Sequence, residues 1–203
     1  MEKGLKIERD SFDIIDSLTD LSRFSDKEKV IVRKLIHTTG DVEFATLARV
    51  FNIEAGVEAL RNGAPIICDV TMVTAGITER YLRQFGNKVF CFINEPEVLA
   101  QAKEMNLTRA ETAMVYAAKR YPEAVYAIGN APTALLKLIE LTESKEMNPT
   151  FVAGLPVGFV KAAESKELLM QTKIPHVSNV GVKGGSPCAA TSINGLLVLL
   201  EAL

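Results

Sequence analysis

One histidine near the end of a predicted helix is the residue in this chain best suited to acid–base chemistry. Residues 29–37 carry apolar side chains at helical spacing, and Ser25 and Glu28 match the capping box that starts a helix. Gly40 is typical of the residue that ends one. His37 therefore falls in the last turn, where the partial negative charge of the helix C-terminus favours the imidazolium form. Such a histidine is a candidate general acid, or it only hydrogen-bonds the last free carbonyls.

Loops rich in glycine and small polar residues follow four of the predicted strands. Small residues ahead of a helix leave backbone N–H groups open to an anion. Ser186 stands before Pro187 as a predicted helix cap. Each loop alone is equally typical of a tight turn, but four together favour a large anionic or polar ligand. The predicted binding residues in these loops are Thr71, Gly129, Asn130, Gly184, Gly185 and Ser186.

Two charged residues remain open to more than one interpretation. Asp69 ends the first predicted strand, where it is either an acid or base or a buried hydrogen-bonding carboxylate. Arg109 begins a predicted helix, where it either clamps a carboxylate or lies on a solvated helix face.

The elements that position these residues alternate between strand and helix. Five nearly continuous apolar runs predict strands that are covered on both faces. They are residues 65–70, 88–93, 124–128, 150–154 and 175–180. Helical segments separate them, at residues 74–85, 95–105, 108–119, 132–143, 159–170 and 188–203. This alternation predicts an α/β, doubly wound, five-stranded parallel sheet, for which the flavodoxin-like order is favoured.

The first third of the chain is predicted to be helical. Helices are expected over residues 7–18, 25–40 and 54–61, with a short one that begins at Asp41 and runs through Ala48. We expect one domain over residues 1–203, in which residues 1–63 form a helical extension packed on residues 64–203.

Composition excludes several classes of protein. The 203 residues carry a net charge of −2 without a basic stripe, which argues against nucleic acid as a partner. Cys68, Cys91 and Cys188 form no C-x-x-C pair and with two histidines predict reduced, packed thiols rather than a metal site. No signal segment or membrane-spanning run is visible, so we expect a soluble cytoplasmic protein. P-loop, G-x-G-x-x-G and G-x-S-x-G motifs are absent.

Several segments together resemble the precorrin-8X (cobalt-precorrin-8) methylmutase family of corrin biosynthesis, over nearly the whole chain. Two blocks are specific, namely Ile-Gly-Asn-Ala-Pro-Thr-Ala-Leu at residues 128–135 and Pro-Val-Gly-Phe-Val at 156–160 with Ala-Ala-Glu-Ser-Lys at 162–166. The other matching segments are residues 20–25, 36–37 with Gly40, 63–69, 72–73 with Gly76, and 184–186.

The resemblance implies a homodimeric isomerase of flavodoxin-like subunits. Such an enzyme moves a methyl group from C11 to C12 of a tetrapyrrole, giving cobyrinic or hydrogenobyrinic acid, without an external cofactor. His37 matches the family's catalytic histidine, Ser11 its substrate-contacting serine, and Arg109 the arginine of its Thr-Arg pair. The chain departs from the family pattern at Thr38-Thr39, where a small residue or cysteine is expected.

Two alternatives stay open from the sequence. A non-catalytic tetrapyrrole carrier uses the same loops and needs His37 only as a helix cap. A flavodoxin-like nucleotide-binding protein predicts affinity for FMN or a nucleotide and none for corrinoids. Nor do the residues say whether the substrate carries cobalt, or which loop meets which carboxylate.

Overall fold

The apolar runs of the sequence form parallel strands at the centre of the molecule. In the computed structural model, which describes residues 2–202, all five predicted strands are present. They are β2 (Ile66–Cys68), β3 (Val89–Cys91), β4 (Val125–Ile128), β5 (Phe151–Gly154) and β6 (His176–Asn179). Their neighbours pair in parallel, in the order β3-β2-β4-β5-β6.

A sixth strand, β1 (Ala48–Phe51), makes the sheet mixed. It pairs antiparallel with β6, so that the full order is β1-β6-β5-β4-β2-β3. The prediction of a five-stranded, all-parallel sheet is therefore wrong, as is the prediction of helix through Ala48 and of a wholly helical first segment. The physical reason is that β6 would otherwise expose a row of unpaired N–H and C=O groups, which the chain covers with this short edge strand.

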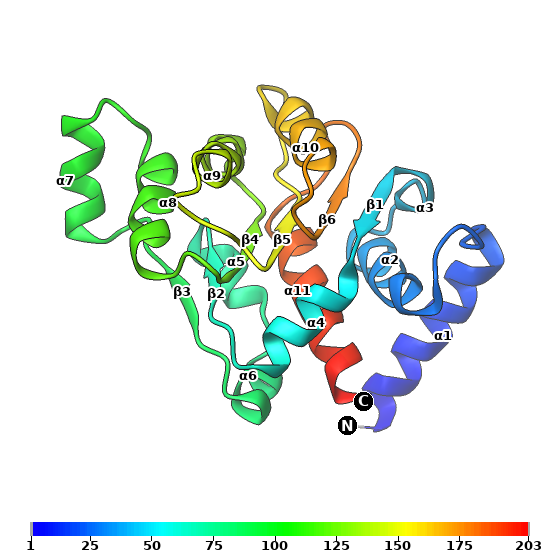
Figure 1. The fold of residues 1–203 in the computed structure, drawn as a ribbon. Helices are drawn as coiled ribbons and strands as arrows, with labels where there is room; N and C mark the ends of the chain where they lie inside the picture. Colours follow the sequence, from blue (N-terminus) through cyan, green and yellow to red (C-terminus); the bar gives the residue numbers. More distant parts are fainter. Residues whose placement is uncertain (1, 203) are drawn as a thin grey trace.

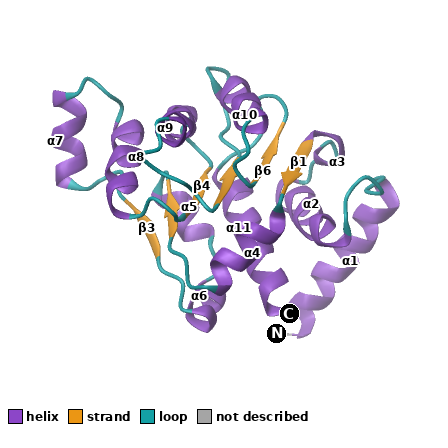
Figure 2. Ribbon diagram, viewed as in Figure 1, coloured by secondary structure: helices purple, strands orange, loops and turns teal. Residues whose placement is uncertain are grey.

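Helices cover both faces of the sheet (Figures 1 and 2). In the first third of the chain they are α1 (Glu2–Leu18), α2 (Asp26–Thr39), α3 (Phe44–Leu47) and α4 (Ile53–Arg61). Between and after the parallel strands they are α5 (Thr71–Gly76), α6 (Glu79–Phe85), α7 (Pro96–Glu104), α8 (Arg109–Arg120), α9 (Pro132–Glu143), α10 (Ala162–Gln171) and α11 (Ser186–Glu201).

Two helix predictions need correction, and the predicted end of a third helix cannot be compared. The helix predicted over residues 74–85 is two helices, α5 and α6, because the chain is extended at Ile77 and Thr78 between them. The helix predicted from Phe159 begins only at Ala162. The predicted end of the last helix at residue 203 lies outside the described residues, and the described helix ends at Glu201.

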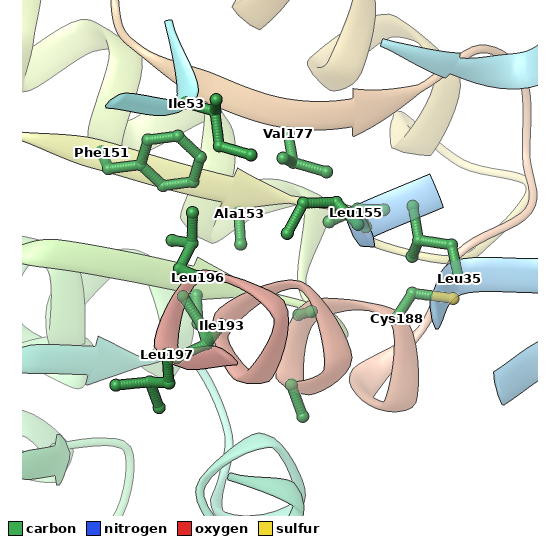
Figure 3. Packing of buried hydrophobic residues seen from close by; sticks show 14 of the residues in the cluster. Leu35, Ile53, Phe151, Ala153, Leu155, Val177, Cys188, Ile193, Leu196 and Leu197 are labelled. Atoms are coloured by element: carbon green, nitrogen blue, oxygen red, sulfur yellow. The ribbon is translucent and has the colours of Figure 1, made fainter. Parts of the chain in front are cut away.

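Alternate residues of the central strands feed two separate cores. In β4, Val125 and Ala127 join a core formed with α2, α4 and α11, whereas Tyr126 and Ile128 join one formed with α8 and α9. Figure 3 shows Leu196 of α11 beside Phe151 of β5 within the first core. This two-sided burial explains why the strands are apolar throughout rather than alternating.

The helix that carries His37 packs directly on α11. A Cβ atom on Gly195 of α11 would clash with the side chain of Ile31 in α2, so the two helices approach closely because that residue is glycine. Ile31, Val32, Leu35 and Ile36 supply the buried face of α2. This contact fixes the end of α2 relative to the sheet. No helix within residues 2–202 is long and apolar enough to cross a membrane.

Candidate active site

His37 lies in the last turn of α2, as the sequence predicts. Ser25 and Glu28 form both hydrogen bonds of the capping box, and Gly40 ends the helix with a φ of 65° in the left-handed region. The Gly40 N–H donates to the Ile36 carbonyl. His37 is therefore held in the last turn of a helix whose two ends are both defined, and it is exposed.

The imidazole of His37 is oriented by α1. Ser11 Oγ lies 2.7 Å from His37 Nδ1, and the Phe12 ring meets the imidazole edge-on with centroids 5.9 Å apart. The two contacts fix one ring nitrogen and the plane of the ring. Nε2 is left as the nitrogen that can reach a ligand.

A hollow of about 420 Å³ opens beside His37. Two of its wall residues, Lys34 and Glu8, form an ion pair at 2.7 Å. A third, Arg80, pairs at 2.9 Å with Glu201 outside the wall. Burial, followed by the charge of Glu201, raises the pKa of Tyr81 in the same wall. The residues around the hollow come from α1, α2, α6, α11 and the turn before α6, and they are Glu8, Lys34, His37, Thr78, Arg80, Tyr81, Thr191 and Asn194.

Thr38, directly after the histidine, ties α2 to α11. Thr38 Oγ1 donates to Thr191 Oγ1 at 3.0 Å, and Thr39 Oγ1 donates to the Leu35 carbonyl within its own helix. Thr191 is five residues beyond Ser186, the first residue of α11, a rise of about 7.5 Å along the helix. The part of the His37 hollow at Thr191 thus lies near the edge of the sheet where the strands have their carboxyl ends, and the hollow extends from there along α11 to Asn194.

At that carboxyl edge, Asp69 joins the loops after β2 and β4. Its carboxylate accepts the backbone N–H groups of Gly129 at 3.1 Å and of Asn130 and Ala131 at 2.7 Å each. Asp69 is fully buried, and this burial raises its pKa against the opposing effect of the backbone N–H groups around it. Of the two interpretations that the sequence leaves open, the buried hydrogen-bonding carboxylate is the one that the geometry matches.

The predicted loop residues after β4 and β6 lie against each other. A Cβ atom on Gly129 would stand 2.6 Å from the Cα of Ser186, so only glycine allows this approach. Gly184 has a φ of 146°, and its missing Cβ faces the Leu155 carbonyl. The Gly185 N–H donates to that carbonyl at 2.8 Å. Thr71 is the first residue of α5, two residues beyond Asp69.

Two details of these loops differ from the prediction. Ser186 is the first residue of α11 rather than its cap, a position that Gly185 holds without a side-chain bond. Asp41 does not cap α3. Its carboxylate accepts the Glu43 N–H and binds the Lys183 ammonium, which also binds Glu43.

Arg109 lies apart from the His37 hollow. It begins α8 after Thr108, whose capping box with Glu111 is complete. Thr108 Oγ1 is 3.3 Å from Thr133 Oγ1 in the first turn of α9, so α8 and α9 start side by side. The exposed Arg109 borders a separate hollow of about 480 Å³ between α7 and α8. The structure thus places it near the carboxyl edge but not beside the histidine.

Sequence reasoning missed a buried lysine behind these loops. Lys166 of α10 is fully buried, and it binds the Lys183 carbonyl. A signal was available, because Lys166 stands at helical spacing with Ala162, Ser165 and Leu169, all of which are buried. Lys34 and Arg80, in the walls of the His37 hollow, left no such signal because only the fold brings their helices together.

The cavity of about 520 Å³ at the opposite, amino edge of the sheet is a poorer candidate site. It is lined by the C-terminal ends of α9 and α10, with Pro149 and Pro175 before the strands. Helix C-termini present carbonyl groups, which disfavour anions. None of the predicted site residues line it. Within residues 2–202 no group of three His, Cys, Asp or Glu side chains is arranged to hold a metal ion.

Known proteins of one family match this chain over almost its full length. The family model described as precorrin-8X methylmutase matches residues 6–199. The chain is 42% identical to cobalt-precorrin-8 methylmutase of Methanocaldococcus jannaschii, over 87% of this chain and 82% of that protein. It is 40% identical to precorrin-8X methylmutase of Sinorhizobium sp, over 95% of this chain and 93% of that protein. A crystal structure of precorrin-8X methylmutase from Thermus thermophilus superposes with a TM-score of 0.90 at 39% identity. The superposition covers 97% of this chain and 96% of that one.

Proposed function

The chain belongs to the precorrin-8X methylmutase family, and we propose that His37 is the general acid of its methyl shift. The protein is an isomerase of cobalamin biosynthesis that moves a methyl group within its substrate. In detail, we take the reaction to be the C11-to-C12 shift of (cobalt-)precorrin-8, giving cobyrinic or hydrogenobyrinic acid.

The contact between Ser11 and His37 is the observation that carries this proposal. When the Ser11 hydroxyl donates to Nδ1, the neutral ring holds its proton on Nε2. When the ring is protonated, Nδ1 donates to Ser11 and Nε2 still holds a proton. In both states the same nitrogen presents an N–H to a ligand in the hollow. The neutral ring offers it as a hydrogen bond, and the protonated ring offers it as the transferable proton of a general acid.

The chemistry demands little else from the protein. A methyl shift within one molecule needs no nucleophile or hydride carrier. It needs a fixed ring conformation and an electron-poor π system at the migration terminus. A proton or strong hydrogen bond delivered by His37 to a ring nitrogen or adjacent atom withdraws electrons and stabilises the transition state.

The carboxylates of the substrate are assigned to the loops at the carboxyl edge. The hollow beside His37 holds only part of a tetrapyrrole, since its volume is about 420 Å³. We place the carboxylate-bearing side chains of the tetrapyrrole that do not fit this hollow against the loops that lead into the N-termini of α5, α9 and α11. The residues concerned are Thr71, Gly129, Asn130, Gly184, Gly185 and Ser186. Ser11 and Arg109 complete the set, the arginine reaching an arm far from the histidine.

An apolar stripe on α1 supports a homodimer. Ile7, Ile14 and Leu18 stand at helical spacing and are 59%, 59% and 65% exposed. A second copy of the chain is the occupant that we assign to this stripe. We further assign the chain a single domain, supported by the packing of α2 on α11 and of β1 on β6, and a cytoplasmic setting, supported by its three free thiols.

The test combines ligand retention with turnover. The purified protein is mixed with cobyrinic or hydrogenobyrinic acid and desalted, and corrinoid absorption is expected to stay with it. Substitution His37→Ala is expected to lower turnover about 10²- to 10⁴-fold while product retention persists. Ser11→Ala is expected to lower turnover less, and Ser17→Ala, on the same helix with its hydroxyl bound to the Ile14 carbonyl, is the matched control.

Each alternative predicts a different result. A tetrapyrrole carrier predicts retention of colour without turnover in the unaltered protein. A nucleotide-binding protein predicts retention of FMN and of neither corrinoid. Unchanged turnover in His37→Ala would remove the general-acid mechanism. Preference for one product bears on whether the natural substrate carries cobalt, a point on which relatives of both names are about equally similar.

A further inference from the structure

Lys166 is a buried cation without a carboxylate partner among the described residues. Its exposed fraction is 0%, and its ammonium donates to the Lys183 carbonyl and, at 3.4 Å, to Asn179 Oδ1. Both acceptors are neutral. Burying an ammonium group without an opposite charge is unfavourable. The burial of Lys166 therefore indicates that its charge acts on the groups around it.

The loop that Lys166 contacts, residues 180–185, leads from β6 into α11. Asn179 Nδ2 donates to the carbonyls of Val180 and Lys183, which closes the loop on itself. On its other side the Lys183 ammonium binds Asp41 and Glu43, just beyond the end of the His37 helix. The loop is therefore held from both sides at the residue before Gly184.

From this arrangement we infer that Lys166 is a positioning residue for substrate binding. Through the Lys183 carbonyl it holds Gly184 and Gly185 in the conformation that receives a substrate carboxylate. Its buried positive charge also increases the affinity of this loop for anions. The inference rests on the proposed function, since the anions concerned are the carboxylates of the corrinoid.

No described group compensates the charge of Lys166. From α11 it faces Cys188, whose thiol is neutral at neutral pH because burial raises its pKa to about 11. From β6 it faces Asn179, while His176 of that strand contacts Phe51 and the Ile174 carbonyl instead.

The remaining charged groups of the packed elements are paired with other residues, are exposed, or line the cavity at the amino edge. In α9, Lys137 pairs with Glu140 at 2.6 Å, and Glu143 lines the cavity at the amino edge. In α10 itself, Glu164 and Glu167 are exposed. Beyond the loop, Asp41 is paired with Lys183.

The protonation of Lys166 is therefore coupled to ligand binding. Burial lowers its pKa to about 8 from the ordinary value of 10.5. A carboxylate bound at the loop favours the ammonium form and moves the pKa back up. By linkage, affinity for the corrinoid is full below pH 8 and falls as the pH rises through the pKa of the free protein.

The experiment measures dissociation constants of cobyrinic and hydrogenobyrinic acid by visible absorption between pH 7.5 and 9.5, with KM and kcat measured alongside. For the unaltered chain we expect affinity to fall about tenfold over this range. Lys166→Met should bind about tenfold more weakly at pH 7.5, lose the pH step, and show a raised KM with little change in kcat. Lys137→Met, which removes a half-buried lysine from the neighbouring helix, is the matched control and should follow the unaltered chain.

Two results overturn the inference. One is a Lys166→Met protein with unaltered affinity and pH step, which would make the lysine only structural. If that variant does not fold, NMR of the unaltered protein with ¹³C-labelled lysine decides, because Lys166 is the lysine expected to titrate near pH 8. Its pKa should rise on adding the corrinoid, and an unchanged value contradicts the inference. Absence of corrinoid binding at every pH would instead reject the proposed function, and the inference with it.

Discussion

The two edges of the sheet satisfy their buried backbone groups with opposite chemistry. At the carboxyl edge, the Asp69 carboxylate accepts three N–H groups from the loop that leads into α9. At the amino edge, the buried Asn87 side chain donates to the carbonyls of Leu60, in the last turn of α4, and of Ala64. Parallel strands joined by helices bring helix N-termini to one edge and C-termini to the other.

This difference explains why only one edge is suited to an anionic substrate. The positive ends of helix dipoles gather at the carboxyl edge, where α5, α9 and α11 begin. The amino edge has the larger cavity, about 520 Å³ against 420 Å³, but its helix ends present carbonyls. Polarity, rather than cavity size, distinguishes the site.

The largest expected effect comes from removing the Asp69 carboxylate at the carboxyl edge. Asp69→Ala leaves three N–H groups without an acceptor and should lower the free energy of unfolding by about 3 kcal/mol. It should also weaken corrinoid binding, because Gly129 and Asn130 lose their anchor. Asn87→Ala, the counterpart at the amino edge, should cost about 1 kcal/mol and leave binding unchanged. Urea unfolding and corrinoid titration measure both, and equal losses of binding would contradict the comparison.

Two glycine substitutions, one at each edge of the sheet, test whether backbone conformation at that edge matters for binding. Gly184→Ala places a Cβ against the Leu155 carbonyl at a φ of 146° and should weaken corrinoid affinity at least tenfold. Gly63→Ala, at a φ of 76° beyond α4, meets nothing within 4 Å. It should cost about 1 kcal/mol of stability without changing affinity. Loss of affinity in Gly63→Ala would show that the amino edge also takes part in binding.

A third effect concerns the dependence of the free energy of unfolding on pH. Between pH 8 and 10.5 the unfolded chain keeps a proton on Lys166 that the folded chain releases, so rising pH favours folding. The stability of the unaltered protein should therefore increase relative to Lys166→Met over this window, and the difference should be constant below it. This slope is opposite in sign to that expected for corrinoid affinity. Urea unfolding at pH 7.5, 8.5 and 9.5 measures it, and parallel curves would contradict the assignment of a buried ammonium.

The smallest effect is expected inside the amino-edge cavity. Lys173→Met removes an exposed charge from its wall, and both turnover and corrinoid affinity should stay within twofold of the unaltered chain. Stability should change by no more than about 0.5 kcal/mol. A marked fall in turnover would assign that cavity a role and weaken the argument from helix polarity.

Local patterns in the sequence determined much of this protein. The strands at residues 66–68, 89–91, 125–128, 151–154 and 176–179 follow from apolar runs that must be buried on both faces. The end of α2 follows from Ser25, Glu28 and Gly40, because caps act within a few residues. His37 could be placed in a last turn for the same reason. The family followed from motifs that are contiguous in the chain.

Contacts between distant segments were decided only by the tertiary structure. β1 is a strand because β6 offers it an unpaired edge about 130 residues further along the chain. Ser11 reaches His37, Asp69 reaches Gly129, and Lys166 reaches the Lys183 carbonyl across separations that no local pattern reports. Arg109 is set apart from the histidine for the same reason. Sequence spacing specifies hydrogen bonds and burial within an element, whereas the choice of partner between elements depends on how the whole sheet and its helices pack.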